Sequence, residues 1–179
     1  DIPIFLENAK KSLSRCVCTL RPKSEGGLFM GKEDERKSIL RLIADYNPFL
    51  LDVEFNTIQK DKKLAVYLKK TKCKLLISWH DFKKTPNDSQ LKSRFNKMRK
   101  FSKIVKIVTV AKNVSDASRL LSLYSIKSNN EMVAFCMGDQ GKFSRILCLH
   151  LGSPFTYVSL GKAIAPGQFS VDEIKSLEN

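Results

Sequence analysis

Short runs of apolar residues alternate with amphipathic segments along the whole chain. Each run is nearly continuous and rich in β-branched or aromatic residues, as in strands that are covered on both faces. The pattern predicts six strands, at residues 16–20, 49–55, 74–82, 104–111, 132–137 and 155–160.

The segments between these runs carry apolar residues three and four positions apart, which is the spacing of one helix face. The expected faces are Phe5, Leu6, Ala9 and Leu13; Ile39, Leu40 and Ile43; Leu64, Tyr67 and Leu68; Leu91, Phe95 and Met98; and Ala117, Leu120, Leu121 and Tyr124. Near the C-terminus, Ser170 and Glu173 have the spacing of a capping box at the start of a helix. One helix followed by six strand–helix units predicts an α/β fold with a parallel sheet, either open or closed as a barrel.

The composition is that of an ordinary globular protein, because 42% of the 179 residues are hydrophobic and 28% are charged. This length is typical of one domain. No apolar run approaches the roughly 20 residues that cross a bilayer, and the first residues do not resemble a signal peptide. We therefore expect a single soluble, cytoplasmic domain over residues 1–179.

The five cysteines are odd in number and lie mostly within apolar runs, which indicates reduced thiols that pack in a core. Cys16 and Cys18 are separated by one residue, and His80 and His150 lie far from them in the sequence. A zinc site needs paired ligands at closer spacing. The sequence predicts no metal site.

The positive charge is concentrated in one stretch of the chain. The formal net charge is +14, and residues 58–106 hold sixteen Lys or Arg against three Asp, a net of +13. Such a block is the solvated face of Lys-rich helices or an electrostatic footprint for nucleic acid. Aromatic residues are not interleaved with the basic ones, and no nucleic-acid motif is present. This favours the solvated face.

Polar residues at the strand ends are the candidates for chemistry, because parallel α/β enzymes build their sites at the C-terminal ends of strands. These candidates are Thr19, Arg21, Asp52, Glu54, Ser78, His80, Lys106, Met137, Gly138 and Ser159. Lys106 is flanked by Ile and Val on both sides, and desolvation favours the neutral, nucleophilic form of an amine. The same pattern fits a lysine that extends to the strand end or pairs with Glu54.

His80 ends the strand that precedes the strand of Lys106. An imidazole beside an amine is what a Schiff-base enzyme needs for proton transfer next to an iminium carbon. A histidine that is only hydrogen-bonded structure fits the position as well. His150 lies in a helix or loop and has no expected role.

The segment MGDQGKFSR, residues 137–145, is rich in glycine but is not a phosphate loop. A phosphate loop has the pattern GxxxxGK[ST], whereas Gly138 and Gly141 are three residues apart and Lys142 precedes Phe143. We expect a turn whose backbone donors, with Ser144 and Arg145, form a cradle for a carboxylate or another anion.

The ordered motifs TLRPKSEGG, DVEF, SWHDF, IVKIV, MGDQGKFSR and APGQFSVDE resemble type I 3-dehydroquinate dehydratases, the Schiff-base lyases of the shikimate pathway. The resemblance runs from about Cys16 to the C-terminus. It implies a (β/α)₈ barrel of the TIM type that dehydrates 3-dehydroquinate to 3-dehydroshikimate in aromatic amino-acid biosynthesis. It also implies that neither a metal nor an organic cofactor takes part.

The same resemblance assigns roles to individual residues. Lys106 forms the imine with the substrate ketone, His80 acts as general base and then as general acid, and Glu54 orients His80 and balances its charge. The implied substrate-binding residues are Arg21, Glu25, Met137, Arg145, Phe155 and Gln168. Among them, Arg145 binds the substrate carboxylate and Gln168 closes over the ring hydroxyls. Arg21 and Glu25 also position the catalytic groups.

The chain departs from the family pattern at two places. Ile164 stands where the family usually has Ser before APGQ, and the family's first two strands are missing, so the chain supplies about six βα units. We expect residues 1–179 alone to be poorly stable or inactive, and an active form to carry roughly 40 further N-terminal residues. The oligomeric state stays open, a homodimer included. The alternative is a non-catalytic barrel remnant that binds anionic partners through its basic helices.

Overall fold

A computed structural model describes residues 1–177 as an α/β fold in two compact units. The first unit comprises residues 1–79 and 98–104, and the second comprises residues 80–97 and the described chain from 105 onward. Each unit is described by itself below. The assignment of residues 1–179 to a single domain stays a prediction.

The first unit is built on three parallel strands. Its elements are α1 (Ile2–Ala9), the 3₁₀ helix η1 (Leu13–Arg15), β1 (Val17–Thr19), the 3₁₀ helix η2 (Lys23–Glu25), α2 (Glu33–Asp45), β2 (Leu50–Glu54), α3 (Phe55–Lys60), α4 (Lys62–Lys70) and most of β3 (Leu75–Asp81). β2 pairs in parallel with β1 and β3, so that Cys18 lies beside Leu51 and Val53 beside Ile77. The register brings the C-terminal ends of these strands to one edge.

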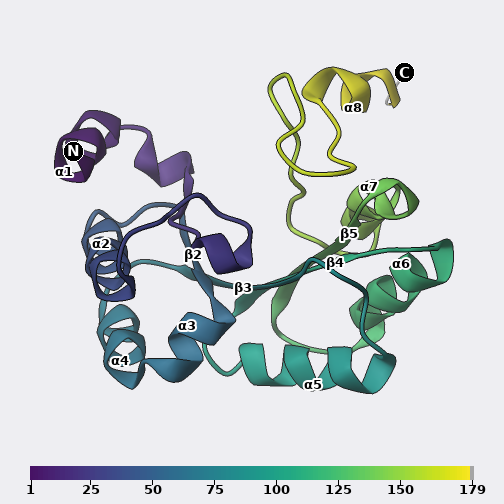
Figure 1. Ribbon diagram of the computed structural model, residues 1–179, viewed down its shortest axis with the longest axis horizontal. Coiled ribbons are helices and arrows are strands. Elements are labelled where there is room, and N and C mark those ends of the chain that lie inside the picture. The colour runs from purple at the N-terminus through teal and green to yellow at the C-terminus, as the bar shows by residue number, and fades with distance from the viewer. Residues whose placement is uncertain (178–179) are drawn as a thin grey trace. The chain divides into compact units, whose positions relative to one another are not determined.

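The helices of this unit begin where the sequence supplies caps and favourable charges. Asp61 accepts a hydrogen bond from the backbone N–H of Leu64 over 2.8 Å, which caps α4. α2 has three acidic residues in its first turn, where the helix dipole favours negative charge. α2 and α4 pack against each other (Figure 1) and bury Leu40 and Leu68.

The second unit contains two neighbouring strands and the helices around them. Its elements are α5 (Asp88–Met98), β4 (Ile104–Val110), α6 (Val114–Leu121), the 3₁₀ helices η3 (Ser122–Ser125) and η4 (Asp139–Gly141), β5 (Glu131–Met137), α7 (Ser144–His150) and α8 (Val171–Leu177). α6 and α7 both pack on β5 (Figure 1). The core between them is formed by Val108, Leu121, Val133, Phe135 and Cys148.

Five of the six expected strands are confirmed. The expected faces around residues 39–43, 64–68, 91–98 and 117–124 are confirmed, but the first face is wrong in part, because Phe5 is 66% exposed and Leu13 lies in η1 and not in α1. The capping box is also confirmed: Ser170 Oγ accepts from the N–H of Glu173 over 3.1 Å, and Glu173 Oε2 accepts from the N–H of Ser170 over 2.7 Å. The sequence pattern did not predict α3, and it left α7 undecided between helix and loop. Among the helices of residues 1–177, none combines the length and the apolar composition that a bilayer crossing requires.

The expected strand at residues 155–160 is wrong. Ser159 instead forms a single bridge to Ser170, with backbone hydrogen bonds from Ser159 N–H to Phe169 and from Val171 N–H to Ser159, each 2.9 Å long. The aromatic residues that made this run look like a strand pack as a loop on the core beside β5. Hydrophobic content alone therefore did not separate a strand from a packed loop.

Candidate functional site

In the first unit, the strand ends carry a cluster of guanidinium and carboxylate groups. Arg21 follows β1, and its Nη2 donates to Asp52 Oδ2 over 2.6 Å. Its Nη1 donates to Glu54 Oε1 over 3.2 Å and to Ser78 Oγ over 3.0 Å. Asp52 and Glu54 are 2% and 1% exposed. The structure thus brings two predicted site residues, Arg21 and Glu54, into direct contact.

Glu54 is held by two arginines. Its Oε1 accepts from Arg21, and its Oε2 accepts from Nη1 of Arg36 over 2.6 Å. Burial raises the pKa of Glu54, and the positive charges of Arg21 and Arg36 oppose that increase. The sequence pattern had not singled out Arg36, although its side chain is fully buried.

Glu25, at the end of η2, is a third buried carboxyl group of this unit, beside Asp52 and Glu54. Its Oε1 accepts a hydrogen bond from Asn56 Nδ2 over 3.0 Å. Burial and the negative charge of Glu54 raise the pKa of Glu25 to about 7, while Arg21 and Asn56 act in the opposite direction. The carboxyl group of Glu25 therefore gains and loses its proton near neutral pH.

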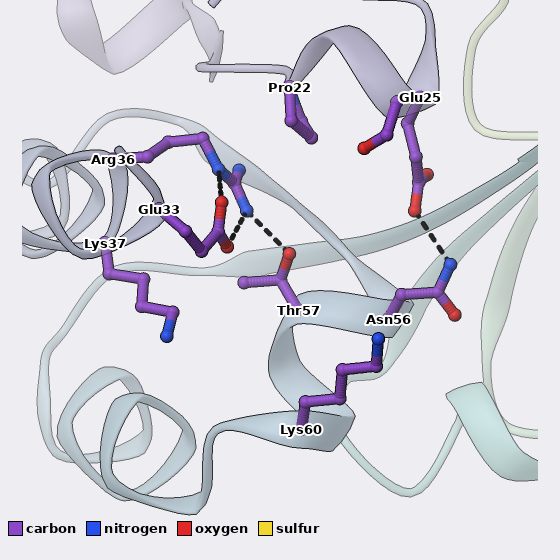
Figure 2. A pocket seen from close by; sticks show the side chains of 9 residues that line it. Pro22, Glu25, Glu33, Arg36, Lys37, Asn56, Thr57 and Lys60 are labelled. Carbon is purple, nitrogen blue, oxygen red and sulfur yellow. Dashed lines mark hydrogen bonds and ion pairs between the residues drawn. The ribbon is translucent and has the colours of Figure 1, made fainter. Parts of the chain in front are cut away.

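A pocket of about 390 Å³ opens beside this cluster (Figure 2). It is lined by Pro22, Ser24, Glu25, Glu33, Arg36, Lys37, Asn56, Thr57 and Lys60. In Figure 2 the bonded pair Glu25 and Asn56 lies at one end, and Arg36 with its partners Glu33 and Thr57 lies at the other. The pocket gives solvent a route to the neighbourhood of Arg36.

In the second unit, Lys106 lies within β4 with only 7% of its surface exposed. Its chain neighbours Val105 and Ile107 are fully buried, as the apolar flanks predicted. The side-chain nitrogen lies 4.3 Å from the centroid of the Tyr157 ring. The face of an aromatic ring attracts a cation. Tyr157 was not predicted as a site residue, although it lies in the aromatic run at residues 155–160.

His80 is the penultimate residue of β3 and is half-buried. Its ring stacks on the ring of Phe82, with centroids 5.8 Å apart and planes 16° from parallel. This confirms its predicted place at a strand end. His150 is the last residue of α7 and is exposed.

The candidate anion site of the second unit contains Arg145, which lies in the first turn of α7. It is 2% exposed, its guanidinium carbon lies 4.4 Å from the centroid of the Phe135 ring, and its Nη2 donates to the carbonyl oxygen of Pro166 over 3.3 Å. Its buried Nε has no hydrogen-bond partner within the described chain. Burial lowers the pKa of Arg145 to about 10. A buried donor without a partner is costly, which favours an anionic ligand at this position.

The turn that carries Gln168 packs on the end of β5. The carbonyl oxygen of Pro166 accepts from the N–H of Gly138 over 3.3 Å, and a Cβ atom at Gly167 would lie 2.7 Å from the Gly138 oxygen. The Gln168 side chain accepts from the N–H groups of residues 164 and 165. Pro166 therefore links Gln168 to Arg145.

Two other predicted residues, Met137 and Phe155, belong to the hydrophobic cluster beside β5. Met137 is buried and ends the strand, and Phe155 is half-buried against it. Of the candidate residues, the first unit contains Arg21, Glu25 and Glu54. The second unit contains His80, Lys106, Met137, Arg145, Phe155 and Gln168.

Part of the expected backbone cradle in residues 137–145 is used within the protein. The N–H groups of Gly138, Gly141 and Lys142 donate to Pro166, Gly138 and Asp139, respectively. These three donors are therefore not available to an anion, whereas the buried side chain of Arg145 beside them is positively charged.

The chain is similar to known proteins over nearly its whole length. A family model described as type I 3-dehydroquinase matches residues 2–178. The 3-dehydroquinate dehydratase of Pyrobaculum aerophilum is 39% identical over 156 residues, which are 87% of this chain and 50% of that protein. The 3-dehydroquinate dehydratase of Pyrococcus abyssi is 34% identical, over 95% of this chain and 78% of that protein. The chain thus spans half of the first relative and more of the second.

Solved structures give the same picture. The type I 3-dehydroquinate dehydratase of Clostridium difficile matches 98% of this chain and 73% of its own, with a TM-score of 0.85 and 24% identity. The 3-dehydroquinate dehydratase of Aquifex aeolicus matches 99% of this chain and 80% of its own, with a TM-score of 0.80 and 26% identity. The fold of this chain is therefore that of part of a (β/α)₈ barrel.

Proposed function

Because the chain belongs to the type I 3-dehydroquinase family, we propose that the protein dehydrates 3-dehydroquinate through a Schiff base on Lys106. The observation that carries the proposal is the buried amino group of Lys106 within β4, beside the face of the Tyr157 ring. A buried amine is a nucleophile for ketones. The iminium that it forms is a cation, and the ring face stabilises a cation.

The reaction proceeds in balanced steps. The amine of Lys106 adds to the substrate ketone, and the adduct loses water to give the iminium. The iminium withdraws electrons, so His80 removes a proton from the neighbouring carbon and an enamine forms. The enamine expels the hydroxyl group of the next carbon, and His80 returns its proton so that water leaves. Addition of water to the iminium then releases 3-dehydroshikimate and restores Lys106.

The remaining candidates bind substrate and orient His80. The guanidinium of Arg145, with its unpartnered Nε, takes the substrate carboxylate. Gln168 closes over the ring hydroxyls, and Met137 and Phe155 provide apolar surface for the substrate ring. These four residues share the region around β5 and Pro166.

The carboxylate cluster of the first unit supplies the other assignments. Arg21 and Glu25 bind substrate and position the catalytic groups, and Glu54 orients His80. Each carboxylate oxygen can accept more than one hydrogen bond, so Glu54 can accept a further donor beside its two arginines.

Trapping of the imine tests the proposal directly. The full-length protein is incubated with 3-dehydroquinate and borohydride, which reduces the iminium to a stable secondary amine, and the modified peptide is mapped by mass spectrometry. We expect one adduct, on Lys106, and parallel loss of activity. Borohydride without substrate is the control and should leave the protein active. An adduct on another lysine, or turnover without any trappable adduct, contradicts the proposal.

Alanine substitution of each histidine in turn distinguishes the catalytic histidine from the other. His80→Ala should lower kcat by about 10²- to 10⁴-fold, the usual contribution of a general acid–base group. His150→Ala should keep the wild-type rate, because His150 is exposed at the end of α7. Both variants are assayed by the ultraviolet absorbance of the conjugated product. Equal losses in the two variants are the result that refutes the role of His80.

A further inference from the structure

Arg36 is a fully buried arginine in α2 whose guanidinium group is bonded on every side. Its Nε and Nη2 donate to the two carboxylate oxygens of Glu33, over 2.8 and 2.7 Å. Nη2 also donates to Thr57 Oγ1 over 2.6 Å (Figure 2). Nη1 donates to Glu54 Oε2 over 2.6 Å and to the carbonyl oxygen of Leu20 over 3.0 Å. All three of its nitrogens are therefore engaged.

These hydrogen bonds connect Arg36 to Arg21 in two ways. Leu20 is the residue before Arg21, so the bond to its carbonyl oxygen fixes the main chain where Arg21 begins. Glu54 is the second route, because its other oxygen accepts from Arg21 Nη1. One side chain of α2 thus connects the loop after β1 with the end of β2.

We propose that Arg36 is a positioning residue for the reaction, which holds the Leu20 carbonyl and the Glu54 carboxylate and through both sets the place of the Arg21 guanidinium. The inference rests on the proposed function, in which Arg21 binds substrate. Arg36 itself touches neither substrate nor the reacting atoms.

Stability alone is a weak reason to bury such a group. Taking charges out of water costs free energy, and apolar replacements of buried ion pairs are often neutral or stabilising. The geometry of the site requires arginine in particular, since its planar fork bonds both oxygens of Glu33 and still reaches Glu54. The ammonium of a lysine, a single point charge, cannot make these bonds together.

Removal of Arg36 should change how activity depends on pH. Arg21 and Arg36 face Glu54 with positive charge, Asp52 and Glu25 are the nearby acidic groups, and burial raises the pKa of Glu54. Without Arg36, that pKa moves further up. Glu54 then stays protonated up to a higher pH than in the wild type, so at the acidic end of the range it no longer pairs with Arg21. It regains its charge, and the ion pair, as the pH rises.

The test compares Arg36→Met with the matched variant Lys37→Met in the full-length protein. Lys37 is the next residue of α2 and lines the same pocket, but it pairs with Asp34 and Asp61. We expect kcat/KM of Arg36→Met to fall by about tenfold or more at the acidic end of the range, as for the loss of a charged hydrogen bond. It should recover as the pH rises, whereas Lys37→Met should keep the wild-type profile.

Nuclear magnetic resonance provides a second readout that does not need turnover. The carboxyl carbon of Glu54, assigned with Glu54→Gln, should titrate at higher pH in Arg36→Met than in wild type, and the guanidinium nitrogen signals of Arg21 should shift with it. An unchanged Glu54 titration, or a loss of activity that is the same at every pH, overturns the inference. If Arg36→Met does not fold, Arg36→Lys is measured instead and should show the same pH-dependent loss in weaker form.

Chemical rescue of Arg36→Ala provides a further test of the role of Arg36. Arg36 borders the open pocket, so added guanidinium ions can reach the space that its side chain leaves in Arg36→Ala. Guanidinium at a low concentration should restore activity several-fold, and sodium chloride of equal ionic strength should not. If the wild-type protein does not turn over 3-dehydroquinate, the proposed function is refuted. The magnetic resonance signals of Glu54 and Arg21 then still show whether Arg36 positions these two side chains.

Discussion

Replacement of Lys106 with methionine should abolish turnover of 3-dehydroquinate. Methionine keeps the length of the side chain and fits the apolar surroundings in β4, but it offers no amine to form the imine. We expect kcat to fall on the order of 10⁶-fold, the scale of loss when a covalent nucleophile is removed. Activity and the melting temperature of the full-length protein are measured together.

The melting temperature distinguishes loss of the catalytic amine from loss of the folded state. An apolar side chain in place of the buried amine should keep the melting temperature close to that of the wild type, because the lost contact with the Tyr157 ring is offset by the end of the amine's desolvation. Lys103→Met, at an exposed lysine just before β4, is the matched control and should stay active. A Lys106→Met protein that is folded and still turns over would rule out the Schiff base at this position.

The strands were predictable where apolar runs were continuous. The runs at residues 49–55, 74–82 and 104–111 became β2, β3 and β4 because their side chains are covered on both faces. The run at 155–160 has a similar composition, yet its aromatic side chains pack on the core from a loop. A strand also needs a hydrogen-bonding partner, and a local pattern does not report one.

Site residues were predictable where the strand itself places them. Arg21 follows β1 and Glu54 ends the neighbouring parallel strand β2, so their contact follows from the topology. Arg36 was missed because an arginine in a helix normally faces solvent, and its burial depends on partners that lie far apart in the sequence. The use of the Gly138 N–H within the protein was missed for a related reason, since its acceptor is the carbonyl oxygen of Pro166, far along the chain.

Removal of the Arg145 guanidinium should weaken substrate binding more than it slows the chemical step. Arg145→Met deletes the buried cation that is proposed to hold the carboxylate, and truncation of one partner of a buried charged pair costs about 2–5 kcal/mol. KM should therefore rise by about 10²- to 10³-fold, with a smaller change in kcat. Inhibition by a ring analogue without a carboxylate should change little. Steady-state kinetics with both compounds provide the measurement.

The folded state should not suffer from this change, which separates binding from structure. Arg145 Nε has no partner in the described chain, and the Pro166 carbonyl keeps the N–H of Gly138 when Nη2 is lost. An apolar methionine in this buried position should therefore maintain the melting temperature. Arg119→Met, which removes an arginine paired with Asp116 on α6, is the matched control and should leave KM unchanged. A lower melting temperature with an unaltered KM would show that Arg145 supports the fold and does not bind the carboxylate.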